Sequence, residues 1–264
     1  MSHELNIIYD SIDESNSEKS AHTRRQLVAG AAAAMGTVGA LTLLDAPEAL
    51  AGEPNTPETI INIAATAEVL ATIVNTVGPE KVELDDTTKR NVRAAATEEK
   101  IHYEALVGPL GGKELTKKIW VPDSVFSNKE NLLKTLVVGD QIFINAYLLA
   151  TSVFSRPSIA MPKPARYAAE IMGVEAVHRA LALQSLGVLG NDRAYMKFTQ
   201  VEENRTSPAF GRNGFNKITS AVKYLEAGGF GLGEEGAKPG QFYDYDEVSK
   251  RTPDVDGVNT RKFT

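Results

Sequence analysis

The sequence contains the pattern Glu-x-x-His twice, as EKIH at residues 99–102 and as EAVH at residues 175–178. The two remaining histidines, His3 and His22, lie near the N-terminus. Both copies stand in apolar stretches with helical spacing, so that Glu99 and His102 share a helix face with residues such as Val92 and Leu106. A buried carboxylate without a partner costs several kcal/mol. The fold must therefore compensate the same unfavourable placement twice.

Proline and glycine divide the chain from Pro57 onward into four long helical segments and one short one. Helices of about 20 residues are ~30 Å long, the size of an antiparallel four-helix bundle. The predicted fold is therefore all-α, with a short fifth helix and an irregular C-terminal tail that forms loop from residue 228. The predicted helices cover residues 57–77, 87–107, 128–154, 164–186 and 215–227.

The first and third helices each carry one acid in an apolar setting. Asp140 lies in line with Leu136 and Phe143, and Glu68 lies mid-helix where no Lys or Arg of its own helix can pair with it. Each acid precedes a Glu-x-x-His by a similar interval, as two helical hairpins would require. Four carboxylates and two imidazoles meeting in a bundle core form the established pattern of a dinuclear carboxylate site. The predicted metal ligands are Glu68, Glu99, His102, Asp140, Glu175 and His178.

Other interpretations of these residues remain open at this stage. Glu98 and His102 form an i, i+4 pair, and Glu98 or Glu104 could take the place of Glu99 in a surface ion-pair pattern. A single Glu-x-x-His is more often a structural helix pair than a ligand set, whereas two copies joined by matching acids favour metal binding. For Tyr103 and Tyr147, hydrophobic packing is favoured over hydrogen bonding to the site.

The composition excludes several classes of function. The chain of 264 residues contains no cysteine, which removes disulfides, iron–sulfur ligation and thiol nucleophiles. Its net charge of −6 and its lack of a basic stripe argue against nucleic acid as a partner. Oxygen and imidazole ligands favour iron or manganese, with zinc as an alternative.

The N-terminus has the features of an export signal. Arg24 and Arg25 precede an uncharged segment at 28–44 and the small-x-small sequence Ala49-Leu50-Ala51. We expect a twin-arginine signal peptide at 1–51 that is cleaved after Ala51, since the segment is marginal as a membrane anchor. The expected domains are then a bundle at 52–190 and a C-terminal extension at 191–264. The expected location is periplasmic or otherwise extracytoplasmic, without stable membrane insertion after cleavage.

The stretches IAATAEVLA, EEKIHYEAL and INAYLLA resemble the ferritin-like domain family, in particular its exported bacterial members. The resemblance covers roughly residues 57–187. The acid of the third helix is usually Glu in that family, seven residues before a tyrosine, and Asp140 holds this place before Tyr147. The shorter Asp reaches less far, which makes it the least secure of the six ligands. The separate resemblance of the N-terminal segment to a twin-arginine signal implies export of a protein that has already folded, often with a cofactor in place.

The function expected from these residues is redox chemistry at two iron or manganese ions. Glu99 and Glu175 would bridge the ions, Glu68 and Asp140 would bind terminally, and each histidine would bind one ion. The expected partners are a metal ion and a small-molecule oxidant, dioxygen or peroxide, in a ferroxidase, oxidase or catalase-like reaction. No catalytic residue beyond the ligands is predicted.

The alternative is a non-enzymatic stress or envelope protein whose metals are structural or absent. Assembly into a homo-oligomer is left open.

Overall fold

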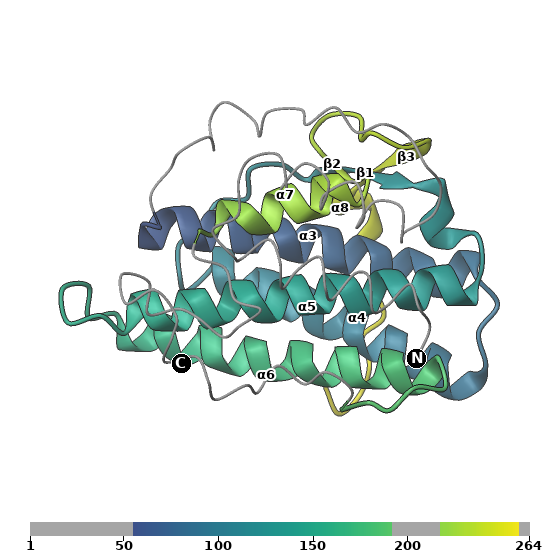
Figure 1. Cartoon of the computed structure of the whole chain (residues 1–264), viewed down its shortest axis with the longest axis horizontal. Coiled ribbons are helices and arrows are strands. Elements are labelled where there is room, and N and C mark those ends of the chain that lie inside the picture. Colours follow the sequence, from purple (N-terminus) through teal and green to yellow (C-terminus); the bar gives the residue numbers. More distant parts are fainter. Residues whose placement is uncertain (1–54, 192–216, 259–264) are drawn as a thin grey trace, which may run out of the picture.

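The structure is a computed structural model that describes residues 55–191 and 217–258. The predicted signal peptide at 1–51 and the first residues of the predicted fifth helix lie outside the described residues. Four long helices dominate the described part (Figure 1). They are α3 (Pro57–Lys81), α4 (Asp86–Val107), α5 (Lys129–Phe154) and α6 (Pro162–Ser185).

The helices pair as two hairpins that face each other. The most extensive helix contacts are those of α3 with α4 and of α5 with α6. Short connections at 82–85 and 155–161 make each pair antiparallel, and the longer segment at 108–128 joins the hairpins. This arrangement confirms the predicted all-α four-helix bundle. It also places one lone acid and one Glu-x-x-His on each hairpin.

Local capping signals set where three of the helices begin. The side chains of Thr56, Asp85 and Asn128 accept hydrogen bonds from the backbone N–H groups of Thr59, Thr88 and Asn131, at 3.1, 3.0 and 2.9 Å. Each of these bonds satisfies a donor that the first helical turn would otherwise leave unpaired. The predicted starts at residues 57, 87 and 128 lie within one residue of those observed.

The predicted end of the first helix at Gly78-Pro79 was wrong, because α3 continues to Lys81. Pro79 lies in the last turn, where its missing N–H removes only one intrahelical bond. The Val82 N–H then closes the helix on the carbonyl of Gly78 at 2.9 Å. Gly78 is needed for close packing, since a Cβ there would lie 2.9 Å from a methyl carbon of Leu132 on α5.

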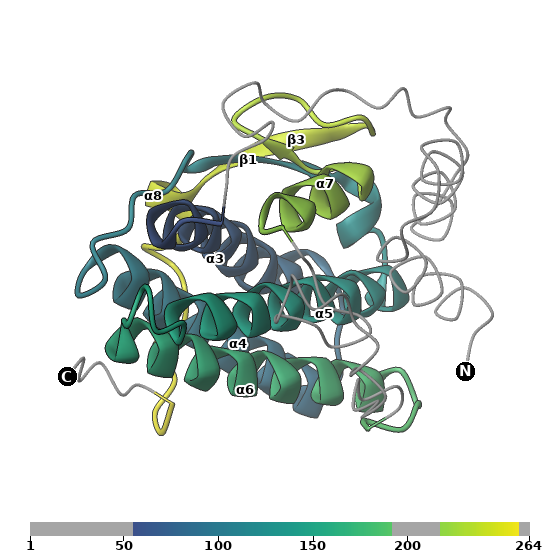
Figure 2. The same cartoon turned by 60° about the vertical axis from the view of Figure 1, so that its left-hand side comes forward.

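A small sheet covers α3 on the side away from α6 (Figures 1 and 2). Strand β1 (Lys118–Pro122) lies between β2 (Gly231–Leu232) and β3 (Gly240–Asp244), and both pairings are antiparallel. The short helices η1 (Asp123–Phe126), α7 (Thr219–Ala227) and α8 (Tyr245–Val248) flank it. The expectation of loop from residue 228 onward missed β2, β3 and α8.

The C-terminal segment is bound to the bundle through specific hydrogen bonds. The Thr97 hydroxyl on α4 donates to the Pro253 carbonyl at 2.7 Å, and the Lys100 ammonium donates to the Ser249 carbonyl at 2.9 Å. Thr76 on α3 and Thr252 are joined by a hydroxyl–hydroxyl bond of 2.9 Å. The described tail is therefore an ordered outer layer over α3 and α4.

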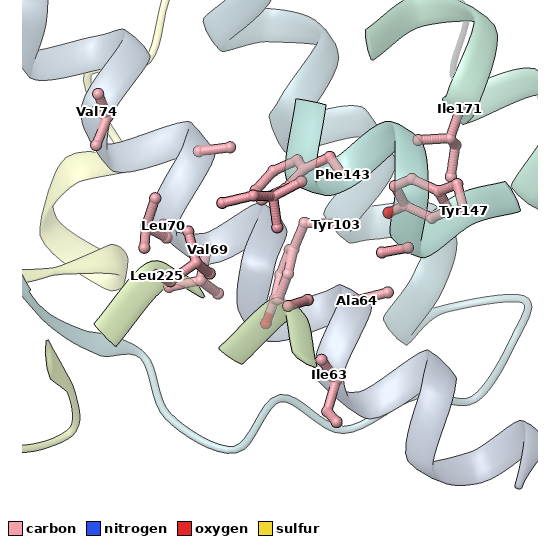
Figure 3. Packing of buried hydrophobic residues seen from close by; sticks show 14 of the residues in the cluster. Ile63, Ala64, Val69, Leu70, Val74, Tyr103, Phe143, Tyr147, Ile171 and Leu225 are labelled. Carbon is pink, nitrogen blue, oxygen red and sulfur yellow. The ribbon is translucent and has the colours of Figure 1, made fainter. Parts of the chain in front are cut away.

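One hydrophobic core runs through the bundle and reaches this outer layer. Leu70 of α3, Phe143 of α5 and Leu225 of α7 belong to it (Figure 3). Among the described residues, α3 and α5 are long and apolar enough to span a membrane by composition, and their apolar windows are 89% and 78% buried inside the protein. Such burial is what core helices of a bundle require.

Candidate metal centre

The structure brings all six predicted ligands together inside the bundle. Glu68 comes from α3, Glu99 and His102 from α4, Asp140 from α5, and Glu175 and His178 from α6. The three glutamates have no exposed surface, and the other three side chains are at most 7% exposed. These residues form two overlapping groups whose candidate ligand atoms lie within 4.8 Å of one another.

The first group, named here the His102 cluster, consists of Glu68, Glu99, His102 and Glu175. The Nδ1 atom of His102 lies 3.2 Å from Oε2 of Glu99, 3.2 Å from Oε1 of Glu175 and 3.6 Å from Oε2 of Glu68. One imidazole nitrogen thus faces three carboxylates from three helices. This donor set matches one terminal carboxylate, two shared carboxylates and one histidine around an ion.

The second group, the His178 cluster, consists of Glu99, Asp140, Glu175 and His178. The Nδ1 atom of His178 lies 3.1 Å from Oε1 of Glu99 and 3.7 Å from Oε2 of Glu175. Glu99 and Glu175 therefore each direct one carboxylate oxygen to His102 and the other to His178. The imidazole centroids are 6.4 Å apart.

Several polar atoms in the two clusters lack a hydrogen bond of acceptable geometry. They are Oε2 of Glu68, Oε1 of Glu99, both carboxylate oxygens of Glu175 and Nδ1 of His178. Buried polar atoms are nearly always paired, and each unpaired one carries a desolvation cost. Divalent cations would satisfy these oxygens and this nitrogen together. The residues of both clusters thus fit metal binding.

Burial and mutual repulsion perturb the acids of the metal-free site. Burial, assisted by the neighbouring charge of Glu99, raises the pKa of Glu68 to about 7. Burial, assisted by Glu175, raises the pKa of Asp140 well above its usual range. Burial alone would lower the pKa of both histidines, but the adjacent carboxylates outweigh it and hold both pKa values well above 6.5. The metal-free site therefore retains protons that cations would replace.

Tyr147 takes part in the site, contrary to the expectation of packing alone. Its hydroxyl donates a short hydrogen bond to Oε1 of Glu68. Burial, followed by the charge of Glu68, raises the pKa of Tyr147 well above its usual value, so the phenol stays a donor. Tyr103 instead packs against Tyr245, with ring centroids 4.5 Å apart. Of these two tyrosines, Tyr147 is the one that fixes the orientation of a candidate ligand.

Glu98, which the sequence offered only as an alternative ion-pair residue, also contacts the site. Its spacing suggested a pair with His102, but its Oε2 atom lies 2.7 Å from Nε2 of His178 on α6. A carboxylate accepts hydrogen bonds, so Nε2 of His178 is the donor, and Nδ1 is left facing the cluster. Carboxylates in this position orient metal-binding histidines in many metalloproteins. The apolar periodicity of α4 carried no signal for it, because Glu98 lies at the edge of the bundle.

Comparison with known proteins gives one match. The sequence profile of the family described as "Ferritin-like domain" matches residues 57–188, which is half of the chain. The matched segment contains α3 to α6 and all six candidate ligands. No curated protein and no solved structure shows significant similarity to the chain.

Proposed function

Because the chain belongs to the ferritin-like domain family, we propose that it binds two iron or manganese ions between the four helices and oxidises Fe(II) with dioxygen or peroxide. Glu99 and Glu175 would bridge the ions. Glu68 and His102 would complete one site, and Asp140 and His178 the other. The family supplies the bundle, and the chemistry is argued from these six side chains.

One observation carries the proposal. Glu99 and Glu175 each place one oxygen beside His102 and the other beside His178, at 3.1 to 3.7 Å. A carboxylate that serves a single ion pair has no reason to divide its oxygens between two imidazoles on different helices. Two carboxylates that do so mark two adjacent positions with equivalent donors. The unpaired carboxylate oxygens of Glu175 and Glu99 lie at these same positions.

Bound iron would supply one-electron redox chemistry with open positions for a small oxidant. With iron as substrate and dioxygen as oxidant, two Fe(II) ions each lose one electron, and dioxygen takes these two electrons and two protons and leaves as hydrogen peroxide. The chain's own groups hold the ions and exclude bulk water. Tyr147 holds Glu68 in place, and Glu98 holds His178 with Nδ1 directed inward.

Anaerobic titration with Fe(II) or Mn(II), followed by exposure to air, tests the proposal. We expect two ions per chain and faster oxidation of Fe(II) than in buffer. Glu99→Gln should remove both effects, because Glu99 serves both clusters. Glu170→Gln is the matched control, since Glu170 also lies on a bundle helix but is exposed and pairs with Arg166. Fewer than one ion per chain would contradict the proposal. Two bound ions that raise the melting temperature without any oxidation would favour the structural role instead.

The proposal includes export by the twin-arginine route and a metal-loaded protein in an extracytoplasmic compartment. It is supported by the Arg24-Arg25 pair and the apolar segment that follows. Replacing both arginines with lysine preserves charge and should retain the full-length chain in the cytoplasm. Fractionation of cells that express the two forms measures this. Equal distribution of both forms would contradict export by this route.

A further inference from the structure

We propose that a pocket between α3, α5 and α7 admits a small, neutral, apolar molecule to the Asp140 side of the metal centre, and that this molecule is dioxygen in the proposed reaction. The identity of the molecule rests on the proposed function, whereas the existence of an apolar binding site does not. This cavity, named the apolar pocket, is lined by Leu70, Val74, Leu136, Gly139, Phe143 and Leu225, among others.

The lining of the apolar pocket selects against ions and polar molecules. Its walls are mostly aliphatic and aromatic, Thr135 and Tyr224 are its hydroxyl-bearing residues, and Asp140 is the sole carboxylate among its lining residues. The pocket contains about 440 Å³ of space free of protein atoms, part of which opens to solvent. A cavity whose lining is mostly apolar favours small apolar species over ions. Leu70 and Leu225, which line two of its walls, face the same region in Figure 3.

Asp140 connects this pocket to the candidate metal centre. It belongs to the His178 cluster and also lines the apolar pocket. Its side chain is one methylene shorter than the glutamates that α3, α4 and α6 supply. The shorter acid leaves space beside the centre where a glutamate would extend further. A molecule in the pocket would therefore lie next to Asp140, which is a candidate metal ligand. No other charged residue lines the pocket.

A second cavity, the polar pocket, also reaches Asp140 and carries more polar side chains. It is lined by Asn75, Thr88, Asn91 and Ser185 together with Asp140 and His178, and its other six lining residues are apolar. Amide and hydroxyl oxygens can bind a hydrated cation, and no amide side chain lines the apolar pocket. A hydrated cation therefore fits the polar pocket better, and an uncharged molecule fits the apolar one better.

Gly139 offers a position from which a larger side chain can extend into the apolar pocket. A Cβ at this position would meet no atom within 4 Å, and Gly139 lines the pocket. Gly139→Leu should therefore occupy the space that the small molecule needs. Gly173→Leu is the matched control. Gly173 is likewise helical with no atom within 4 Å of a Cβ, but it lies on α6 and lines none of the described pockets.

Xenon tests the pocket independently of any metal or turnover. Xenon binds apolar cavities of this kind, so ¹²⁹Xe NMR of the metal-free protein or diffraction from xenon-pressurised crystals should locate it beside Leu70 and Phe143. Gly139→Leu should lose this binding, and Gly173→Leu should retain it. Absence of xenon from the pocket of the unsubstituted protein, or retention of xenon by a folded Gly139→Leu variant, would overturn the inference.

Kinetics then tests dioxygen as the occupant. In the iron-loaded protein, Gly139→Leu should raise the KM for dioxygen severalfold, while the anaerobic Co(II) titration stays that of the unsubstituted protein. Xenon under pressure should compete with dioxygen in the unsubstituted protein, so the result does not depend on the variant's folding. An unchanged KM in a variant that has lost xenon binding would refute the oxygen route and leave the proposed function standing. Absence of oxidation in every form would refute the proposed function, whereas the xenon result would still stand.

Discussion

Nε2 of His178 and Oε2 of Glu98 lie 2.7 Å apart and join α6 to α4 at the edge of the candidate metal centre. The Glu98 side chain retains 27% of its exposure, whereas that of His178 retains 5%. The carboxylate thus anchors a buried imidazole from the solvent side. Because Glu98 accepts the hydrogen bond from the Nε2–H group, Nδ1 is the ring nitrogen that faces Glu99 and Glu175.

Glu98→Ala should weaken metal binding at the His178 cluster by roughly 10–100-fold, because the imidazole loses the partner that sets its tautomer. Binding at the His102 cluster should change little, so a Co(II) titration followed by absorption should separate into a tight and a weak phase. Glu98→Gln should partly restore the affinity, since its amide oxygen can still accept the bond. Glu170→Ala controls for loss of a surface carboxylate, and equal weakening of both phases would contradict this role of Glu98.

Tyr147→Phe should destabilise the metal-free protein by about 1–3 kcal/mol, because it leaves a buried carboxylate oxygen of Glu68 without its donor. The loss should be smaller once metal is bound, since a cation satisfies the same carboxylate. Denaturant unfolding with and without Mn(II) measures both values. Tyr103→Phe, which alters a ring packed against Tyr245, should show no such metal dependence. Equal losses in the two conditions would mean that Tyr147 acts through packing.

The melting temperature of the metal-free protein should fall as pH rises from about 5 to about 8. Burial raises the pKa of Glu68 from 4.5 to about 7, and the neighbouring acids hold the pKa of His102 and His178 well above 6.5. The folded state therefore binds more protons than the unfolded state across this range, and stability decreases with pH.

Each kcal/mol lost corresponds to about 2–4 °C in Tm for a chain of this size. Metal ions compete with the same protons, so the rise in Tm on adding Mn(II) should be larger at the higher pH. Calorimetry at both pH values, with and without Mn(II), measures this. A metal-free Tm that rises with pH would show that the cluster does not retain protons.

Gly236→Ala should detach the sheet layer while leaving the bundle folded. A Cβ at Gly236 would lie 2.0 Å from the Gly229 carbonyl oxygen and 2.7 Å from a ring carbon of Trp120 on β1. Limited proteolysis should then cut between β2 and β3, with metal content unchanged. Gly173→Ala, in an open helical position, should leave cleavage unchanged. Loss of metal together with the sheet would show that the two layers fold as one unit.

The bundle could be predicted because its signals are local. Apolar periodicity, the Pro and Gly breakers and the capping residues Thr56, Asp85 and Asn128 each act within a few residues. The convergence of the six polar residues could also be anticipated, because acids in apolar helix faces are buried and each needs a partner that offsets its charge.

The remaining features depend on contacts between distant segments. Residues 118–122 form a strand because they pair with residues 240–244. Each segment is too short for its own sequence pattern to identify it as a strand. Glu98 forms its hydrogen bond with His178 on α6 and not with His102, which lies one turn further along α4. This choice of partner depends on how α4 packs against α6. The glycines after residue 228 fold the tail closely over Trp120 and do not form a phosphate-binding loop.

The position of β1 has a consequence for the order of assembly. β1 stands between the two hairpins in the sequence, yet both of its partner strands are made after α6. During synthesis the ribosome releases all four long helices before either edge of β1 can be closed. The bundle is therefore able to collapse first, and the last part of the chain then seals it, so that a truncation before residue 231 would leave β1 with both edges unpaired.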